Sequence, residues 1–300
     1  MVTTPESGID LSDLAGFDLW LGDGLLRFGP GTLAVEPAER RLSDASAVLL
    51  YPGETGPDVL YRMYRGTGAA DDQRAMGSQG LRYDITVVYP GTIGSEYVKT
   101  VGHYHPRVPG QPWTYPELYQ VLSGRAHFLL QKGGEITGEI DDFIVADFET
   151  GDILLIPPFH GHVTVNPGSE PLVMANWIAR DFSSVYDPIK RRKGMAYYDV
   201  EYKGQSIFMP NDSYKSHPKP RLIQTGRHSG TRFAPRAEHI QGLAVWRESR
   251  LPVQALSLRG VLEWLGAHSG RICSASGRHR RSPPWRSPVG RREREPLGKE

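Results

Sequence analysis

Cysteine is almost absent from this chain, since Cys273 is the only one among 300 residues. A disulfide within the chain is therefore impossible, which excludes disulfide-stapled secreted domains and fits a reducing compartment. No apolar run approaches the roughly 18 residues that a membrane-spanning helix needs. The first residues also lack the basic and apolar regions of a secretory signal. We therefore expect a cytoplasmic protein without a membrane partner.

Glycine-rich phosphate loops of the P-loop or dinucleotide type are also missing. The pair Gly133-Gly134 is more simply explained as a hairpin turn. What the chain has in quantity is 34 glycines and 24 prolines, which favour turns and short strands over long helices.

The charge is unevenly distributed behind a net value of +1. Residues 227–300 hold 15 Lys/Arg and 6 Asp/Glu, a balance of +9, whereas residues 1–226 carry −8. Residues 277–300 are rich in Arg, Pro and Ser and cannot bury enough apolar surface to order themselves. We expect residues 226–300 to be a basic, largely disordered tail. Nucleic-acid binding is the alternative for such a run, but we favour a solvated tail without a nucleic-acid partner.

Short segments with alternating apolar residues follow one another at regular spacing, which predicts an all-β antiparallel sandwich or small barrel. We expect residues 46–225 to form this domain and residues 1–45 to be an N-terminal extension that packs on it. Residues 37–43 begin with a proline and predict the start of a short helix. The expected strands of the later part are Asp84–Tyr89, Val98–Tyr104, Leu118–Leu122, Ala126–Gln131, Ile144–Phe148, Ile153–Ile156, His162–Val165 and Leu172–Ala179.

Three histidines and one glutamate form the clearest chemical pattern. His103 and His105 are two residues apart, so on a strand both imidazoles would point to one face. Glu117 opens an apolar run that ends at a turn glycine, and His162 follows a Pro-Pro turn. Three imidazoles and a carboxylate suit a divalent first-row metal such as Fe, Mn, Ni or Zn. The pattern therefore predicts a metal site.

These residues fall into two half-motifs, one from Thr100 to Gly124 and one from Gly151 to Asn166. The half-motifs resemble the two motifs of the cupin superfamily and, more narrowly, those of the cupin-type glucose-6-phosphate isomerases, over about residues 45 to 215. The eleven residues between His105 and Glu117 form a longer segment than is common among cupins.

The resemblance implies a jelly-roll fold with short peripheral helices and one divalent metal ion per subunit, with Fe²⁺ expected and Mn²⁺, Ni²⁺ or Zn²⁺ as alternatives. It also implies a homodimer that interconverts glucose 6-phosphate and fructose 6-phosphate. The resemblance implies that Glu117 is a metal ligand and the proposed proton carrier, with a hydride shift between C1 and C2 as the alternative route. Tyr119 is then expected to bind or polarise a sugar hydroxyl, and His160 is a candidate for ring opening.

The resemblance further assigns the substrate phosphate to Thr86, Thr100 and Gly102, with a further substrate contact at Tyr186. Ile178 stands where a phosphate-binding tyrosine is expected, which is a departure from the family.

Two other functions use the same metal ligands. A cupin Fe²⁺ dioxygenase would need an apolar pocket, and a sugar-binding cupin would have no turnover. The threonine pair and Gly102 favour a phosphorylated substrate, and the complete ligand set favours an enzyme.

Overall fold

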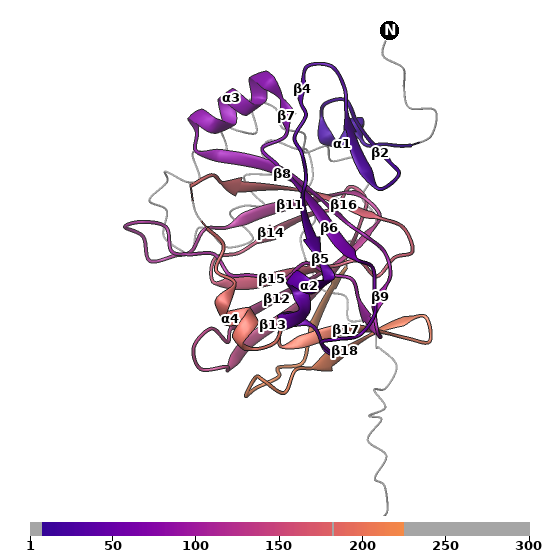
Figure 1. Cartoon of the computed structure of the whole chain (residues 1–300). Helices are drawn as coiled ribbons and strands as arrows, with labels where there is room; N and C mark the ends of the chain where they lie inside the picture. The colour runs from indigo at the N-terminus through magenta and orange to yellow at the C-terminus, as the bar shows by residue number, and fades with distance from the viewer. Residues whose placement is uncertain (1–7, 182, 225–300) are drawn as a thin grey trace, which may run out of the picture.

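The computed structural model describes residues 8–181 and 183–224, and it is built mostly of β-strands (Figure 1). The helices are short: α1 (Ser12–Ala15), α2 (Leu42–Ala45), the 3₁₀ helix η1 (Ser46–Val48), α3 (Ala70–Ser78) and α4 (Asp187–Arg191). The strands are β1 (Ile9–Asp10), β2 (Leu19–Gly22), β3 (Leu25–Phe28), β4 (Thr32–Leu33), β5 (Ala38–Arg41), β6 (Val59–Arg65), β7 (Gly68–Ala69), β8 (Leu81–Val88), β9 (Thr92–Ile93), β10 (Glu96–Tyr97), β11 (Glu117–Ser123), β12 (Arg125–Gly133), β13 (Ile140–Glu149), β14 (Ile153–Ile156), β15 (His160–Val165), β16 (Leu172–Ala179), β17 (Tyr197–Tyr202), β18 (Gln205–Pro210) and β19 (Arg221–Gln224).

Two larger sheets form the body of the protein. The six-stranded sheet has the order β14-β11-β16-β8-β6-β5, and the four-stranded sheet has the order β15-β12-β13-β19. Neighbouring strands are antiparallel except for the parallel pair β13 and β19. A further sheet, β18-β17-β10-β9, lies beside them. The predicted all-β cupin-like sandwich with short peripheral helices is confirmed.

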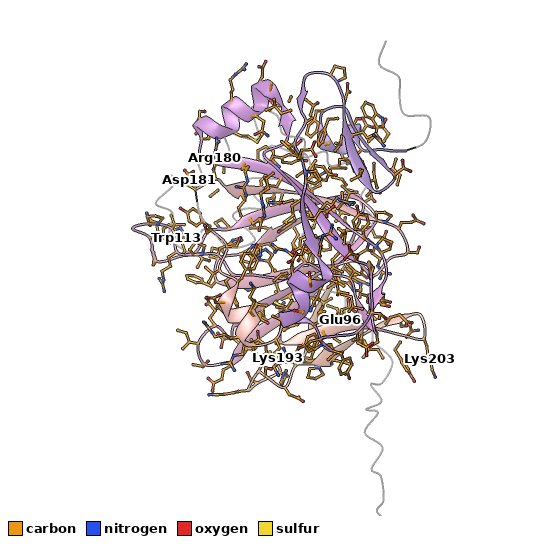
Figure 2. All side chains as sticks on the ribbon, in the orientation of Figure 1. Glu96, Trp113, Arg180, Asp181, Lys193 and Lys203 are labelled. Atoms are coloured by element: carbon orange, nitrogen blue, oxygen red, sulfur yellow. The ribbon has the colours of Figure 1, made fainter. Side chains whose placement is uncertain are left out.

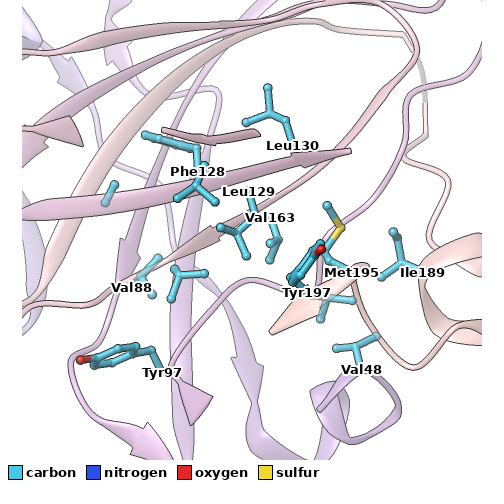
Figure 3. Close-up of a cluster of buried hydrophobic side chains, with 14 of the residues drawn as sticks. Val48, Val88, Tyr97, Phe128, Leu129, Leu130, Val163, Ile189, Met195 and Tyr197 are labelled. Atoms are coloured by element: carbon cyan, nitrogen blue, oxygen red, sulfur yellow. The ribbon is translucent and has the colours of Figure 1, made fainter. Parts of the chain in front are cut away.

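The main hydrophobic core draws side chains from both larger sheets (Figure 3). Tyr119 of β11 packs on Phe128 of β12, with 5.4 Å between the ring centroids. Because these strands belong to different sheets, this contact closes the space between them. Fully buried members such as Val88, Phe128 and Val163 are visible in the close-up.

A second core covers the outer face of the six-stranded sheet. Tyr83, Ile85 and Val87 alternate along β8 and belong to this cluster together with residues of the N-terminal segment such as Phe17 and Leu19. Since side chains alternate across a strand, the residues between them point to the opposite face, toward the main core. The N-terminal elements therefore bury the outside of the sheet and leave its inside for the site.

Two expectations about local structure are wrong. Residues 98–104 do not form a continuous strand: they make only isolated bridges, and Gly102 has a φ of +78°, which breaks the extended backbone. The helix expected from residue 37 begins only at Leu42. Residues 38–41 instead extend the six-stranded sheet, because Arg40 pairs with Tyr61 of β6.

The predicted basic tail, residues 226–300, lies outside the described residues, so the domain boundaries stay predictions. Among the residues that the structure describes, no helix is long and apolar enough to cross a membrane.

Candidate metal centre

His103 and His162 face each other although they are far apart in the chain. The backbone N–H of His103 donates to the carbonyl of His162 at 3.1 Å, and that of His162 donates back at 3.0 Å. Residues that exchange both bonds lie directly opposite in an antiparallel pair, so their side chains share a face. The ring centroids are 4.5 Å apart. Main-chain pairing therefore joins the two half-motifs at their histidines.

His105 turns its Nε2 toward the same point. Its Nε2 lies 3.2 Å from Nε2 of His103, and its Nδ1 lies 2.7 Å from the carbonyl oxygen of Tyr115. A carbonyl can only accept a hydrogen bond, so Nδ1 carries the proton of the neutral ring and Nε2 keeps its lone pair. This is the arrangement that orients a histidine for metal binding.

Glu117, the first residue of β11, supplies the carboxylate. Its Oε2 lies 3.3 Å from Nε2 of His105 and 3.2 Å from Nε2 of His162. Its Oε1 accepts a hydrogen bond from Nδ2 of Asn176 at 2.7 Å. One oxygen is thus fixed by β16, and the other points at the histidines.

The four side chains fit a metal ion. One ligand atom from each of His103, His105, Glu117 and His162 lies within 4.8 Å of the others. Ligands about 2.1 Å from a metal and at right angles are about 3 Å from one another, close to the separations of 3.2 and 3.3 Å found here. Several hydrogen-bond acceptors that converge in a buried place repel each other unless a cation lies between them.

The protonation states also suit metal binding. Burial lowers the pKa of His103, and the neighbouring rings of His162 and His105 lower it further. Burial likewise lowers the pKa of His162. Burial alone would raise the pKa of Glu117, but its close interactions with the rings of His105 and His162 outweigh burial and hold that pKa below its ordinary value. Neutral imidazoles and an ionised carboxylate are the forms that bind a metal.

The long segment between His105 and Glu117 forms a loop that projects from the barrel, with Trp113 near its tip (Figure 2). The N–H of Tyr115 donates to the carbonyl of Pro106 at 3.1 Å, which brings the two ends of the loop together. Thr114 accepts a bond from the N–H of Phe159 at 2.6 Å, so the loop also contacts the Pro-Pro turn. The loop is therefore anchored both at its base and to the turn that precedes β15.

Two tyrosines border the histidine cluster. The hydroxyl of Tyr119 lies 3.5 Å from Nε2 of His162. Burial raises the pKa of Tyr119, and the charge of Glu117 raises it further, so this phenol keeps its proton. The ring of Tyr186 lies 5.4 Å from that of His103. Both tyrosines therefore lie against histidines of the cluster.

The residues expected at the phosphate come from two parts of the fold: Thr86 from the six-stranded sheet, and Thr100 and Gly102 from the segment beside β15. Thr86 is a buried residue of β8. The Oγ1 of Thr100 accepts the backbone N–H of Thr164 at 3.0 Å and keeps its own proton available for donation. A Cβ at Gly102 would lie 3.2 Å from the carbonyl oxygen of His162, and the positive φ adds strain, so glycine is required there.

His160 is not a member of the converging group. Its Nδ1 lies 2.9 Å from the carbonyl oxygen of Pro158. Burial lowers its pKa, and the charges of Lys132 and Asp142 act on it in opposite directions. Its expected part in ring opening stays a prediction.

Two contacts to the ligands were missed in the sequence. The Tyr115 carbonyl holds His105, and a backbone atom leaves no sequence signal. Asn176, in contrast, is a polar residue inside the apolar run 172–179. A buried amide in a strand needs a partner, and that was a usable signal.

Comparisons with known proteins agree on one family. The sequence pattern of the family "Glucose-6-phosphate isomerase (GPI)" matches residues 39–216. The glucose-6-phosphate isomerase of Thermococcus litoralis is 29% identical over 182 residues, which is 59% of this chain and 86% of that protein. A putative glucose-6-phosphate isomerase 2 of Rhizobium meliloti is 30% identical over 190 residues, covering 57% of this chain and 86% of that protein.

Among solved structures, the oxalate decarboxylase of Lactobacillus farciminis overlaps with a TM-score of 0.30 at 18% identity, over 42% of this chain and only 31% of that protein. So partial an overlap carries no argument about function. The family match spans more than half of the chain and includes all four converging side chains. The chain therefore belongs to the cupin-type glucose-6-phosphate isomerase family.

Proposed function

We propose that this isomerase interconverts glucose 6-phosphate and fructose 6-phosphate with one divalent metal ion, held by His103, His105, Glu117 and His162. The convergence of these four side chains within 4.8 Å carries the proposal. Fe²⁺ is the expected ion, and Mn²⁺, Ni²⁺ and Zn²⁺ fit the same donor set. When bound, the ion supplies positive charge that stabilises an oxyanion developing on the sugar.

The protein groups have separate tasks in this proposal. Glu117 carries the proton between C1 and C2 of the open-chain sugar, and its contact with Asn176 keeps the carboxylate in place. The protonated hydroxyl of Tyr119 donates a hydrogen bond to a sugar oxygen. His160 assists ring opening. The burial of the cluster excludes water, which strengthens these interactions and protects the enediol. A hydride shift between C1 and C2 is the alternative route.

The phosphate is proposed to bind at Thr86, Thr100 and Gly102, and Tyr186 to contact the substrate. A homodimer and a cytoplasmic location complete the proposal. The dimer is argued from the strand pairing common among cupins, and light scattering of the purified protein tests it. The location rests on the glycolytic reaction and on the single cysteine.

The experiment is a coupled fructose 6-phosphate assay on chelated protein that is restored with each of the four ions. We expect chelation to abolish turnover and at least one ion to restore it. Glu117→Gln should lose about 10²- to 10⁴-fold in kcat, the usual contribution of a proton-transfer group. Glu149→Gln, at the exposed end of β13, is the matched control and should keep full activity.

Two results would contradict the proposal. Protein shown by mass spectrometry to contain no metal, yet fully active, would remove the metal from the reaction. Oxygen consumption without isomerisation of any sugar phosphate would indicate the dioxygenase function instead.

A further inference from the structure

Arg40 lies on β5, the edge strand of the six-stranded sheet, directly opposite Tyr61 of β6. Opposite residues of an antiparallel pair share a face. Tyr61 is buried at 3% exposure in the main core, so the side chain of Arg40 is on the inner face as well.

Among the described residues, no carboxylate lies within ion-pair distance of the Arg40 guanidinium, although the charge of Asp44 acts on it and its neighbouring arginines do form ion pairs. Within residues 8–181 and 183–224 it forms no ion pair, and its buried Nε has no hydrogen-bond partner. Arg41, the next residue, pairs with Glu39 and Asp58, and Arg62 pairs with Glu39. A partly buried cation without an anion is costly unless a ligand supplies the negative charge.

The surroundings of Arg40 connect it to the proposed substrate site. The Tyr61 hydroxyl accepts the backbone N–H of Val101 at 3.3 Å, and Val101 lies between Thr100 and Gly102. Burial lowers the pKa of Arg40, but the interaction and hydrogen bond with Tyr61, together with Tyr186 and the Asp44 carboxylate, outweigh burial and raise it. Since Tyr186 packs on His103, the two tyrosines that act on Arg40 contact the metal cluster and the backbone of Val101.

The expected phosphate site has a deficit of positive charge. A sugar phosphate carries close to two negative charges at neutral pH, whereas Thr86, Thr100 and Gly102 offer only hydroxyl groups and a backbone N–H. Ile178, which is 5% exposed, offers only hydrocarbon. A guanidinium is the side chain best shaped to bind phosphate through two parallel hydrogen bonds.

Two other arginines near the cluster are less suited to this task. Arg82 is held by Asp84, with 2.8 Å between Nε and Oδ1. Arg65 acts on His103 through its charge, but it is an exposed residue at the end of β6. Arg40 is the one that combines burial, an unused donor and a place next to Val101.

We propose that Arg40 binds the phosphate group of the substrate. This inference rests on the proposed isomerisation of a sugar phosphate. The proposed substrate site then includes a charged residue from β5, a strand outside both half-motifs. This residue selects phosphorylated over neutral sugars.

The test compares Arg40→Gln and Arg40→Lys with Arg41→Gln, whose arginine points away from the site and pairs at the surface. In metal-loaded protein we expect Arg40→Gln to raise KM for fructose 6-phosphate about 10- to 100-fold, the loss of a charge-assisted hydrogen bond. We expect kcat to change little and the inhibition constant of inorganic phosphate to rise by a similar factor. Arg40→Lys should be intermediate, and Arg41→Gln should match the native protein.

Calorimetric titration of the same proteins with glucose 6-phosphate and with glucose separates this inference from the proposed function. The native protein could bind glucose 6-phosphate without isomerising it. In that case the role of Arg40 is still supported if Arg40→Gln loses affinity for glucose 6-phosphate, keeps its affinity for glucose, and is the only variant to do so. Equal affinity of native and Arg40→Gln protein for glucose 6-phosphate overturns the inference, as does an equal loss in Arg41→Gln. If the native protein binds no sugar phosphate, both the proposed function and the role of Arg40 are overturned. Thermal melting identifies any variant that has failed to fold. If Arg40→Gln is such a variant, the affinity of Arg40→Lys for glucose 6-phosphate decides whether Arg40 binds the phosphate.

Discussion

His103 and His162 exchange two backbone hydrogen bonds, so the register of the chain, and not only side-chain packing, sets the distance between the two half-motifs. Such a pair keeps its geometry when a single side chain is removed. Substitutions at the cluster should therefore change metal binding and activity while the fold survives, which makes the following predictions measurable.

His162→Ala should lose bound metal and nearly all turnover, because one of four converging donors disappears. His160→Ala is the matched control for metal content, since His160 lies on the same strand but outside the converging group. Mass spectrometry of the purified proteins gives the metal content. Metal retained in His162→Ala, or lost equally in both variants, would show that the ligand set is wrong.

Asn176→Ala should weaken metal binding by about 10- to 100-fold, the usual effect of removing a group that orients a ligand. The reason is that Oε1 of Glu117 loses its 2.7 Å hydrogen bond. Competition with a chelator of known affinity measures the change. Ser123→Ala, at the far end of β11, should behave like native protein. Unchanged affinity in Asn176→Ala would mean that Glu117 is held by other contacts.

Stability should depend on pH through His127, away from the metal cluster. Its Nδ1 lies 2.6 Å from Asp199 and its Nε2 lies 3.4 Å from Asp147. Burial lowers the pKa of His127, but the two carboxylates outweigh burial and raise it. Because the pKa of His127 is raised in the folded protein, its protonation stabilises the fold fully at pH values below the pKa of the unfolded chain, about 6.5. This stabilisation is lost as the pH rises through the pKa of the folded protein.

The native free energy of unfolding should therefore exceed that of His127→Gln most below pH 6.5, and the difference should shrink at higher pH. Urea unfolding of both proteins at a series of pH values, at one metal concentration, measures it. Because the histidines of the metal cluster are common to both proteins, their opposite pH dependence cancels. A difference that grows with pH would contradict the raised pKa.

Removal of residues 226–300 should leave kcat/KM unchanged. The family match ends at residue 216, and the last described strand, β19, ends at Gln224. The coupled assay compares this protein with full-length chain. A deeper truncation from residue 221 provides the contrast, because it removes β19 from its partner β13 and should lower the melting temperature. An inactive first truncation would show that the predicted tail belongs to the fold.

The sequence was most informative where chemistry and spacing coincide. His103, His105, Glu117 and His162 could be grouped because four metal-binding side chains occur in two recognisable half-motifs, and the structure brings them together. The supporting argument for the first pair was only partly right. The two histidines do meet, at 3.2 Å, but on a segment interrupted by Gly102 and not on a regular strand.

Long-range pairing explains what was missed. Residues 37–43 carry a local helix signal, yet four of them pair with β6, since tertiary hydrogen bonds outweigh weak propensity. The same pairing places Arg40 near Val101, which no local pattern could indicate. Asn176 reaches Glu117 from the neighbouring strand, 59 residues further along the chain, for a similar reason. The composition and the alternation of apolar residues predicted the class of fold. The register in which the strands pair decided which polar residues meet.

The position of β5 has a practical consequence for dividing this chain. A fragment cut at the expected domain boundary, to start at residue 46, would keep both half-motifs, yet it would leave the flank of β6 with a row of unsatisfied amide and carbonyl groups. Exposed flanks of this kind recruit strands from other molecules. Such a fragment would lose the arginine opposite Tyr61 and would also aggregate more readily. A loss of activity caused by aggregation could then be mistaken for the loss of a catalytic group.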